Sequence, residues 1–274
     1  TPLEPAHLDC PRWRYDGVAP GPLPAEWQPD DYRFGSFRDP GSARSPHRLC
    51  GQLGAAVDLA WGVDRGRPDV VIAVLDSGIK WHDAAAMRDL ADQAYLNRGE
   101  LPVPQPAGTG ADPYDSNGDG RFTVSDYSAD PRVQDRNGNH LRDPEDLILT
   151  PAIRDGVHDD RDGYVDDISG WDFLNDDNDP LDDVSYGHGT GEARDSTAAH
   201  NGTGDAGTCP RCLHLPVRVS DSFIADGGRF AAALLFGLDS GADVVQEALG
   251  AIDDPPQAQA AIDAAWRRGV PVVA

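Results

Sequence analysis

Two short motifs carry side chains suited to proton transfer. The first is Leu75-Asp76-Ser77-Gly78-Ile79, in which a carboxylate ends an apolar run that starts at Val70. An aliphatic run of this kind predicts a parallel strand buried on both faces, and catalytic groups gather at the carboxyl ends of such strands. Taken alone, Asp76 could equally cap the next helix. The second motif is Tyr186-Gly187-His188-Gly189-Thr190-Gly191, which opens a helix expected over residues 192–199.

A carboxylate beside an imidazole activates a hydroxyl nucleophile, because the carboxylate orients the ring and the ring accepts the proton. Together the two motifs resemble the Asp and His motifs of the subtilisin-like serine peptidases, whose triad residues follow in the order Asp, His, Ser. The resemblance covers residues 55–101 and 156–274. It implies that Asp76 and His188 are catalytic and that the substrate is a polypeptide.

The nucleophile of this family is not found in the 274 residues. In the family it lies in a Gly-Thr-Ser motif after the segment that ends here. We therefore expect the complete protein to continue beyond Ala274 and this chain alone to be inactive. The alternative is a noncatalytic calcium-binding protein on the same scaffold, which is favoured by Gly191 and Ala248, because these stand where the family usually has His and Ser.

The segment from Gly241 to Gly250 is similar to the strand that flanks the substrate in this family. The resemblance implies that backbone groups of Leu249 and Gly250 pair with an extended peptide, since strand addition uses main-chain hydrogen bonds. A core strand followed by a turn is the alternative.

A long insertion separates the two motifs, and its first half has the spacing of a calcium loop. Oxygen-bearing side chains occupy positions 1, 3 and 5 of residues 115–126, with glycine at position 6 and a carboxylate at position 12. The expected Ca²⁺ ligands are Asp115, Asn117, Asp119, the carbonyl of Arg121, and Asp126. The last is Asp where Glu is usual, and an ordinary loop of Asx turns remains the alternative.

Residues 135–146 repeat this spacing, with His140 in the place of the glycine. The expected ligands are Asp135, Asn137, Asn139, the carbonyl of Leu141, and Asp146. A short helix is expected over residues 144–149, because proline is tolerated in a first helical turn. The two loops predict a compact calcium module whose ions stabilise the folded state by binding to it alone.

A third acidic cluster spans residues 159–167 and leads into Trp171-Asp172-Phe173. It resembles the approach to the His motif in many calcium-dependent subtilisin-like peptidases. Asp160, Asp162 and Asp166 are its candidate cation ligands, and a solvated acidic turn is the alternative.

Composition narrows the possible partners. The net charge is -24, which disfavours binding to nucleic acid or to anionic lipid surfaces. The sequence contains no run of 18 apolar residues, so it predicts no membrane span. The first residues lack the basic and apolar regions of a signal peptide, so we expect any such peptide to be removed or not included. We expect a secreted protein.

The four cysteines fall into two pairs. Cys10 and Cys50 lie in a segment rich in proline and glycine, where a disulfide would compensate for a poor core. Cys209 and Cys212 could form a redox pair, half a zinc site or a local disulfide, and the strand expected directly after them favours a structural disulfide.

The order of elements predicts the fold class. Residues 1–54 are expected to form an irregular, proline-rich extension, residues 55–101 and 156–274 the catalytic domain, and residues 102–155 the calcium-binding insertion. Beyond His188, helix and strand patterns alternate over 215–219, 229–240, 241–250, 255–268 and 269–274. Such alternation predicts an α/β fold of three layers, with a doubly wound, mostly parallel sheet.

Overall fold

The computed structural model describes residues 36–38, 46–48, 57–61, 63–184, 187–201, 204, 206–251 and 253–274. The expected Cys10–Cys50 pair and most of the predicted extension lie outside these residues. Within the extension, β1 (Ser36–Arg38) pairs with β2 (Pro46–Arg48) in antiparallel fashion. Helix α1 (Val57–Trp61) follows.

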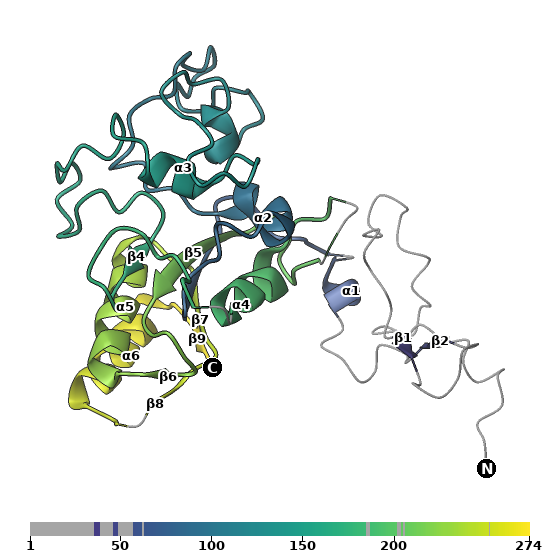
Figure 1. Ribbon diagram of the computed structural model, residues 1–274. Coiled ribbons are helices and arrows are strands. Elements are labelled where there is room, and N and C mark those ends of the chain that lie inside the picture. The colour runs from purple at the N-terminus through teal and green to yellow at the C-terminus, as the bar shows by residue number, and fades with distance from the viewer. Residues whose placement is uncertain are drawn as a thin grey trace.

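A central sheet of five parallel strands organises the chain, in the order β4-β5-β3-β7-β9 (Figure 1). The predicted α/β fold with a mostly parallel sheet is therefore confirmed. The middle strand is β3, and all six of its residues are buried, as its aliphatic sequence requires. The strands are β3 (Val71–Asp76), β4 (Trp171–Asp172), β5 (Leu213–Arg218), β7 (Val244–Glu247) and β9 (Val272–Val273).

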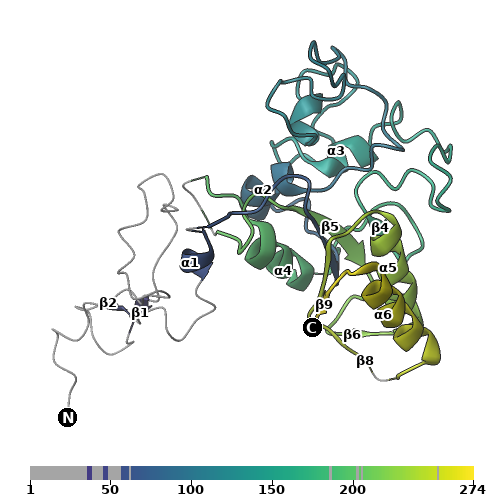
Figure 2. The ribbon, with the colours of Figure 1, turned by 180° about the vertical axis from the view of Figure 1, so that it is seen from behind.

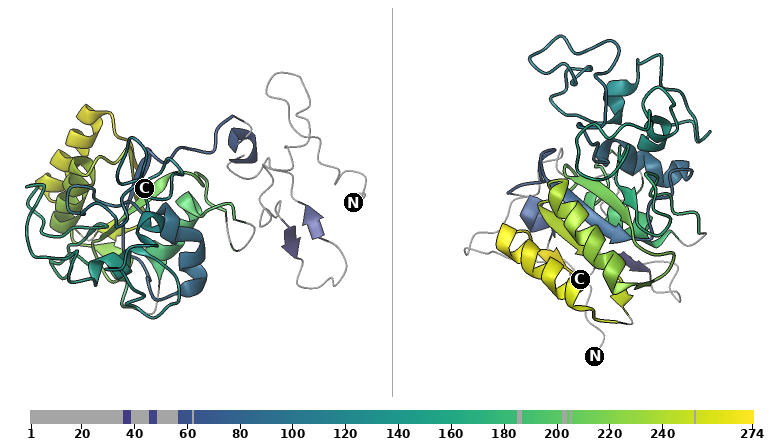
Figure 3. Two further views of the ribbon diagram at one scale, coloured as in Figure 1. Left: turned by 90° about the horizontal axis from the view of Figure 1, so that it is seen from above. Right: turned by 90° about the vertical axis from the view of Figure 1, so that its left-hand side faces the viewer.

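Helices cover both faces of the sheet (Figure 3). On one face, Ala73 and Leu75 of β3 share a hydrophobic cluster with α5 (Gly227–Asp239) and α6 (Pro256–Arg268). On the other face, Val74 packs in a cluster with α2 (Ala84–Leu90) and α4 (His188–Thr197). Because successive residues of a strand point to opposite faces, one apolar strand supplies both interfaces.

The insertion extends the second of these clusters. It contains a 3₁₀ helix at Val124–Tyr127 and helix α3 (Pro144–Ile148), which begins at a proline and is capped by the side chain of Asp143. Apolar residues of both helices pack with Met87 and Leu90 of α2. Figure 2 shows the insertion as irregular chain beyond α2, at the end of the sheet away from α6.

Several element boundaries differ from those expected. The helix expected from Ala84 ends at Leu90 and continues as a 3₁₀ turn at Ala91–Gln93. The strand expected over 241–250 ends at Glu247, and β8 (Gly250–Ala251) then pairs with β6 (Ile224–Ala225) instead of the main sheet. No helix in the described part of the chain is long and apolar enough to cross a membrane.

Candidate active site

Asp76 and His188 meet at the carboxyl end of β3. The Nδ1 atom of His188 lies 2.8 Å from Oδ1 and 2.9 Å from Oδ2 of Asp76, across 112 residues of sequence. Asp76 is 1% exposed, so its carboxylate is held away from water. Because a carboxylate only accepts hydrogen bonds, Nδ1 must carry the proton, which leaves the lone pair of the neutral ring on Nε2.

Ser77 ties the two motifs together. Its amide donates to Oδ1 of Asp76 at 2.7 Å, and its hydroxyl oxygen accepts from the amide of Gly189 at 3.0 Å. The amide of Lys80 donates in turn to Oγ1 of Thr190 at 2.9 Å. The segment after β3 therefore holds the first turn of α4, and with it the imidazole of His188.

Helix α4 begins at His188 itself, four residues before the expected start. Gly187 precedes it with a φ of 72°, in the left-handed region that glycine adopts without strain. The sequence had predicted that this motif opens a helix beginning only at Glu192. Contacts of Gly189 and Thr190 with the segment after β3 account for the earlier start, since such tertiary contacts override weak helix propensity.

A buried arginine fixes the loop that leads from β4 to His188. The guanidinium of Arg218 at the end of β5 lies 3.0 Å from Oδ2 of Asp172 and 2.6 Å from Oδ1 of Asp183. Asp172 is fully buried, and its burial raises its pKa against the opposing effects of backbone amides and Arg218. Sequence analysis missed this bridge, because Arg218 lies 46 and 35 residues from its two partners in the chain.

The other side of the His188 ring faces an acidic and an aromatic group. Oε1 of Glu192 lies 3.8 Å from Nε2, and the ring of Phe223 stands edge-on to the imidazole at a centroid distance of 4.9 Å. The second carboxylate oxygen of Glu192 accepts from the amide of Gln246 at 2.7 Å. None of these three residues was predicted, although Glu192 could have been noticed one helical turn after His188.

Leu249 and Gly250 lie next to this region. The amide of Gly250 donates to the carbonyl of Phe223 at 2.7 Å, as the first bond between β8 and β6. Gly250 is exposed and Leu249 is half-buried. Main-chain pairing with a peptide at this position would therefore have to use groups other than the Gly250 amide.

The first calcium-like loop closes on its own acidic side chains. The carboxylate of Asp115 accepts from the amides of Gly118 and Gly120, at 2.8 and 3.0 Å. The carboxylate of Asp126 accepts from the amides of Ser116 and Thr123, at 2.8 and 2.9 Å. Carboxylate, amide and carbonyl oxygens of this kind are the donor set that Ca²⁺ prefers.

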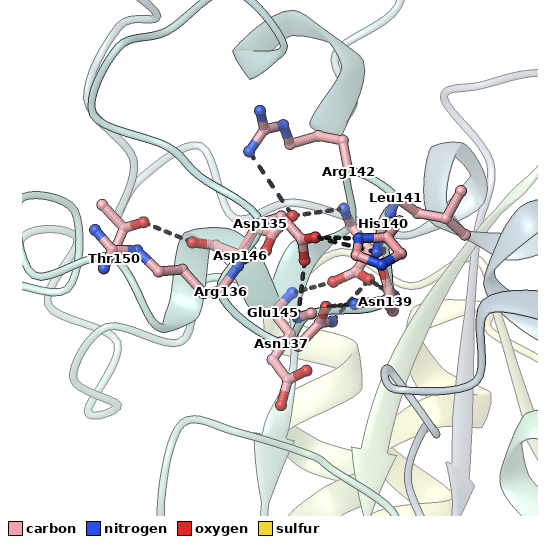
Figure 4. Close-up of polar contacts among 12 residues, drawn as sticks. Asp135, Arg136, Asn137, Asn139, His140, Leu141, Arg142, Glu145, Asp146 and Thr150 are labelled. Carbon is pink, nitrogen blue, oxygen red and sulfur yellow. Dashed lines mark hydrogen bonds and ion pairs between the residues drawn. The ribbon is translucent and has the colours of Figure 1, made fainter.

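The second loop repeats the arrangement (Figure 4). Asp135 accepts from the amides of Gly138 and His140, and Oδ1 of Asp146 accepts from the amide of Arg136 at 2.6 Å. His140 adopts a φ of 67°, so it takes the left-handed conformation expected of the glycine that it replaces. Oδ1 of Asn139 accepts from the amide of Leu141 at 2.7 Å.

The third cluster gathers a different set of residues from the one predicted. Among the described residues, two groups of three side chains bring their potential ligand atoms within 4.8 Å of one another. The first group is Glu100, Asp160 and Asp167. The second group is His158, Asp160 and Asp162, so Asp160 belongs to both. Asp166 instead accepts from the amides of Asp155 and Gly156, at 3.0 and 2.9 Å.

Asp167 is the most perturbed carboxylate of this cluster. It is 1% exposed, and burial together with the nearby charges of Asp162, Asp160 and Glu100 raises its pKa to about 8. The amide of Asn97 donates to Asp160 and to Asp167, at 2.8 Å each. Asn97 and Glu100 were missed as site residues because they precede the acidic run by about sixty residues.

Cys209 and Cys212 form a disulfide directly before β5. Cys212 is fully buried within the cluster that includes Ile72 and Ala193. The pair closes a short loop between α4 and β5, as the local-disulfide interpretation requires.

Comparison with known proteins adds an independent line of observation. The model of the Subtilase family matches residues 67–274, which is more than half of the chain. The thermophilic serine proteinase of Bacillus sp. (strain AK1) is 38% identical over 138 residues, which cover 47% of this chain and 32% of that protein. Thermitase of Thermoactinomyces vulgaris is 37% identical over 111 residues, covering 39% of this chain and 38% of thermitase. The matched part thus spans about a third of these relatives.

Proposed function

Because the chain belongs to the subtilase family, we propose that it forms the front part of the catalytic domain of a serine endopeptidase. Its proposed reaction is hydrolysis of peptide bonds in polypeptides. The observation that carries the proposal is the contact between the Asp76 carboxylate and Nδ1 of His188, at 2.8 and 2.9 Å. The names of the two relatives, a serine proteinase and thermitase, support the same activity.

The geometry suits acyl transfer with a serine supplied by a part of the protein outside these 274 residues. Nε2 of His188 would accept the proton of that serine as its oxygen attacks the peptide carbonyl, and would return the proton to the leaving amine. Asp76 would hold the protonated ring in place and stabilise its positive charge. Water would then release the acyl group by the same route, with His188 again as the base.

We propose that extended substrates lie along Leu249 and Gly250, next to the ring of Phe223. The β6–β8 pair stands beside the imidazole, and Phe223 is 48% exposed there. An exposed aromatic ring beside the base offers apolar surface to a substrate side chain, while carbonyl groups of the β8 segment offer main-chain acceptors.

We also propose that Ca²⁺ stabilises this domain. The two loops would supply Asp115, Asn117, Asp119, the Arg121 carbonyl and Asp126, and then Asp135, Asn137, Asn139, the Leu141 carbonyl and Asp146. In the third cluster, Asp160 would be a ligand together with Glu100 and Asp167, or together with His158 and Asp162, and Asp166 lies outside both groups. A bound cation would compensate for the burial and the carboxylate repulsion that together raise the pKa of Asp167, and would favour the folded state by mass action.

A secreted location is part of the same proposal. Calcium is abundant outside the cell, where the proposed loops would be filled, and the Cys209–Cys212 disulfide persists in an oxidising compartment. A polypeptide substrate and a net charge of -24 fit an extracellular peptidase better than a nucleic-acid-binding protein.

The second candidate function is a noncatalytic calcium-binding protein on this scaffold. Gly191 and Ala248, which depart from the residues usual in the family, favour it. A sulfonyl fluoride distinguishes the two, because it reacts with the activated serine of a working peptidase. We expect the reagent to label the complete protein at one serine, and the rate of peptide hydrolysis to fall in proportion to the fraction labelled. The His188→Ala variant should resist labelling. Absence of labelling and of hydrolysis would favour the noncatalytic protein.

A further inference from the structure

Asp182 is a buried carboxylate beside the Asp76–His188 pair that the chemistry above does not use. It is 3% exposed, and burial raises its pKa. Its Oδ2 accepts from the hydroxyl of Ser77 at 2.9 Å, while Oδ1 has no hydrogen-bond partner among the described residues. The Ser77 hydroxyl, the charges of Lys80 and Arg218 and the amide of Val184 act against this rise, but they do not fully offset it.

The position of Asp182 is set by the backbone on both sides of it. Its amide donates to the carbonyl of Ile79 at 2.8 Å, and the amide of Ile79 donates to the carbonyl of Pro180, also at 2.8 Å. These two bonds place the loop before His188 alongside the segment after Asp76. The two backbone hydrogen bonds therefore hold the carboxylate of Asp182 next to the Ser77 hydroxyl, without any contribution from the exposed part of the loop.

Ser77 is the residue through which this carboxylate can act on the catalytic pair. A hydroxyl has one proton to donate, and Asp182 accepts it. The lone pairs of Ser77 Oγ are then free to accept from the amide of Gly189, while the amide of Ser77 donates to Asp76. Asp182 therefore fixes the direction of the chain of hydrogen bonds that joins the Asp motif to the residue after His188.

We propose that Asp182 is a positioning residue for the Asp76–His188 pair, acting through the hydroxyl of Ser77. Replacing it would free the Ser77 side chain to leave its present χ1 rotamer, so that Oγ moves away from the Gly189 amide and the first turn of α4 shifts relative to Asp76. The proposed catalytic consequence rests on the peptidase function above, whereas the structural consequence does not.

The test is amide hydrogen exchange at Gly189, followed by NMR in the complete protein, together with the kinetics of peptide hydrolysis. We expect Asp182→Ala and Ser77→Ala each to speed exchange at Gly189 by roughly tenfold, the factor that one net hydrogen bond supports. Asp182→Asn keeps an oxygen acceptor for Ser77 and should retain the slow exchange. Asp176→Asn removes an exposed carboxylate from the same loop, at a position with a φ of 61° that Asn tolerates, and should change neither readout.

In kinetics, Asp182→Ala should lower kcat by roughly 10- to 100-fold with little change in KM, because misplacement of the base affects chemistry and not substrate binding. The double variant Ser77→Ala/Asp182→Ala should be no slower than the worse single variant. Unchanged Gly189 exchange in both Asp182→Ala and Ser77→Ala would overturn the proposal, as would independent, multiplicative effects on kcat. If the complete protein hydrolyses no peptide, the exchange experiment still decides the role of Asp182, so the two failures are distinguishable.

Discussion

Gly189 approaches Gly78 so closely that a methyl group on Gly189 would lie 2.4 Å from the carbonyl oxygen of Gly78. The same methyl group would lie 3.0 Å from Cβ of Asp76. The first turn of α4 thus rests directly on the backbone of the turn after β3. The short distance between Asp76 and His188 depends on this contact between two glycines.

Gly189→Ala should therefore separate the pair. The backbone carbonyl of Gly78 cannot move as a flexible side chain could, so we expect a destabilisation of about 1–3 kcal/mol, typical of overpacking. The hydrogen-bonded Nδ1 proton of His188 should also disappear from the NMR spectrum.

Gly191→Ala is the matched control, in the same helix. A methyl group there meets no atom within 4 Å, and alanine has the higher helix propensity. It should stabilise the protein by up to about 1 kcal/mol and keep the Nδ1 resonance. Equal effects of the two substitutions in thermal unfolding would contradict the close-packing account.

Loss of the buried arginine should be far more costly than loss of an exposed one. Arg218→Met leaves Asp172 buried without its counter-charge, and we expect the free energy of unfolding to fall by about 3–5 kcal/mol in urea denaturation. Arg268→Met removes an ion pair with Asp239 whose side chains are 48% and 60% exposed, so the loss there should be about 1 kcal/mol or less. Similar losses at the two sites would show that the Arg218 bridge does not stabilise the loop.

Calcium removal should lower the melting temperature, and Asp119→Asn should reduce the size of that effect. The asparagine keeps an oxygen that accepts from the Arg121 amide, as Asp119 does at 2.8 Å, but removes one charge from the proposed site. At a calcium concentration 100 times the dissociation constant, one filled site contributes about 2.7 kcal/mol.

Asp221→Asn is the control for general charge, because Asp221 is exposed and lies outside the loops. It should leave the chelator-induced shift as it is in the unaltered protein. If Asp119→Asn behaves in the same way, the first loop is a set of Asx turns without a calcium ion.

The buried histidine of β5 should make the protein sensitive to acid. His214 is fully buried, and burial lowers its pKa to about 3. Between about pH 6.5 and 3 the unfolded chain therefore binds a proton that the folded protein does not, so stability is lost as the pH falls through this range. His214→Leu should flatten the dependence of melting temperature on pH between 6.5 and 4. An unchanged slope would mean that other groups cause the acid sensitivity.

The sequence was most informative where chemistry lies in a local pattern. The aliphatic run before Asp76 specified a central parallel strand, because burial on both faces leaves no alternation of polar residues. The glycines beside His188 and after Asp76 belong to these local motifs, and in the structure Gly189 lies directly against Gly78. The spacing of residues 115–126 and 135–146 is also local, because Asp115 and Asp135 accept from amides three and five residues further along the chain; calcium binding at these loops stays a prediction.

Such local patterns could not predict contacts between residues that are distant in the chain. Arg218 joins Asp172 and Asp183 across two strands, and Glu100 reaches Asp160 and Asp167 only after the chain has folded. The predicted end of the strand over 241–250 was also wrong. After Glu247 the chain leaves the main sheet, and β8 pairs with β6, because tertiary contacts rather than β propensity determine the pairing.

The most direct measurement of the central claim is a double-mutant comparison of kcat for peptide hydrolysis by the complete protein. If Asp76 and His188 act as one unit, Asp76→Asn and His188→Ala should each lower kcat by roughly 10⁴-fold or more, and the double variant should be about as slow as the slower single variant. Full activity after either substitution, or losses that multiply in the double variant, would contradict the account.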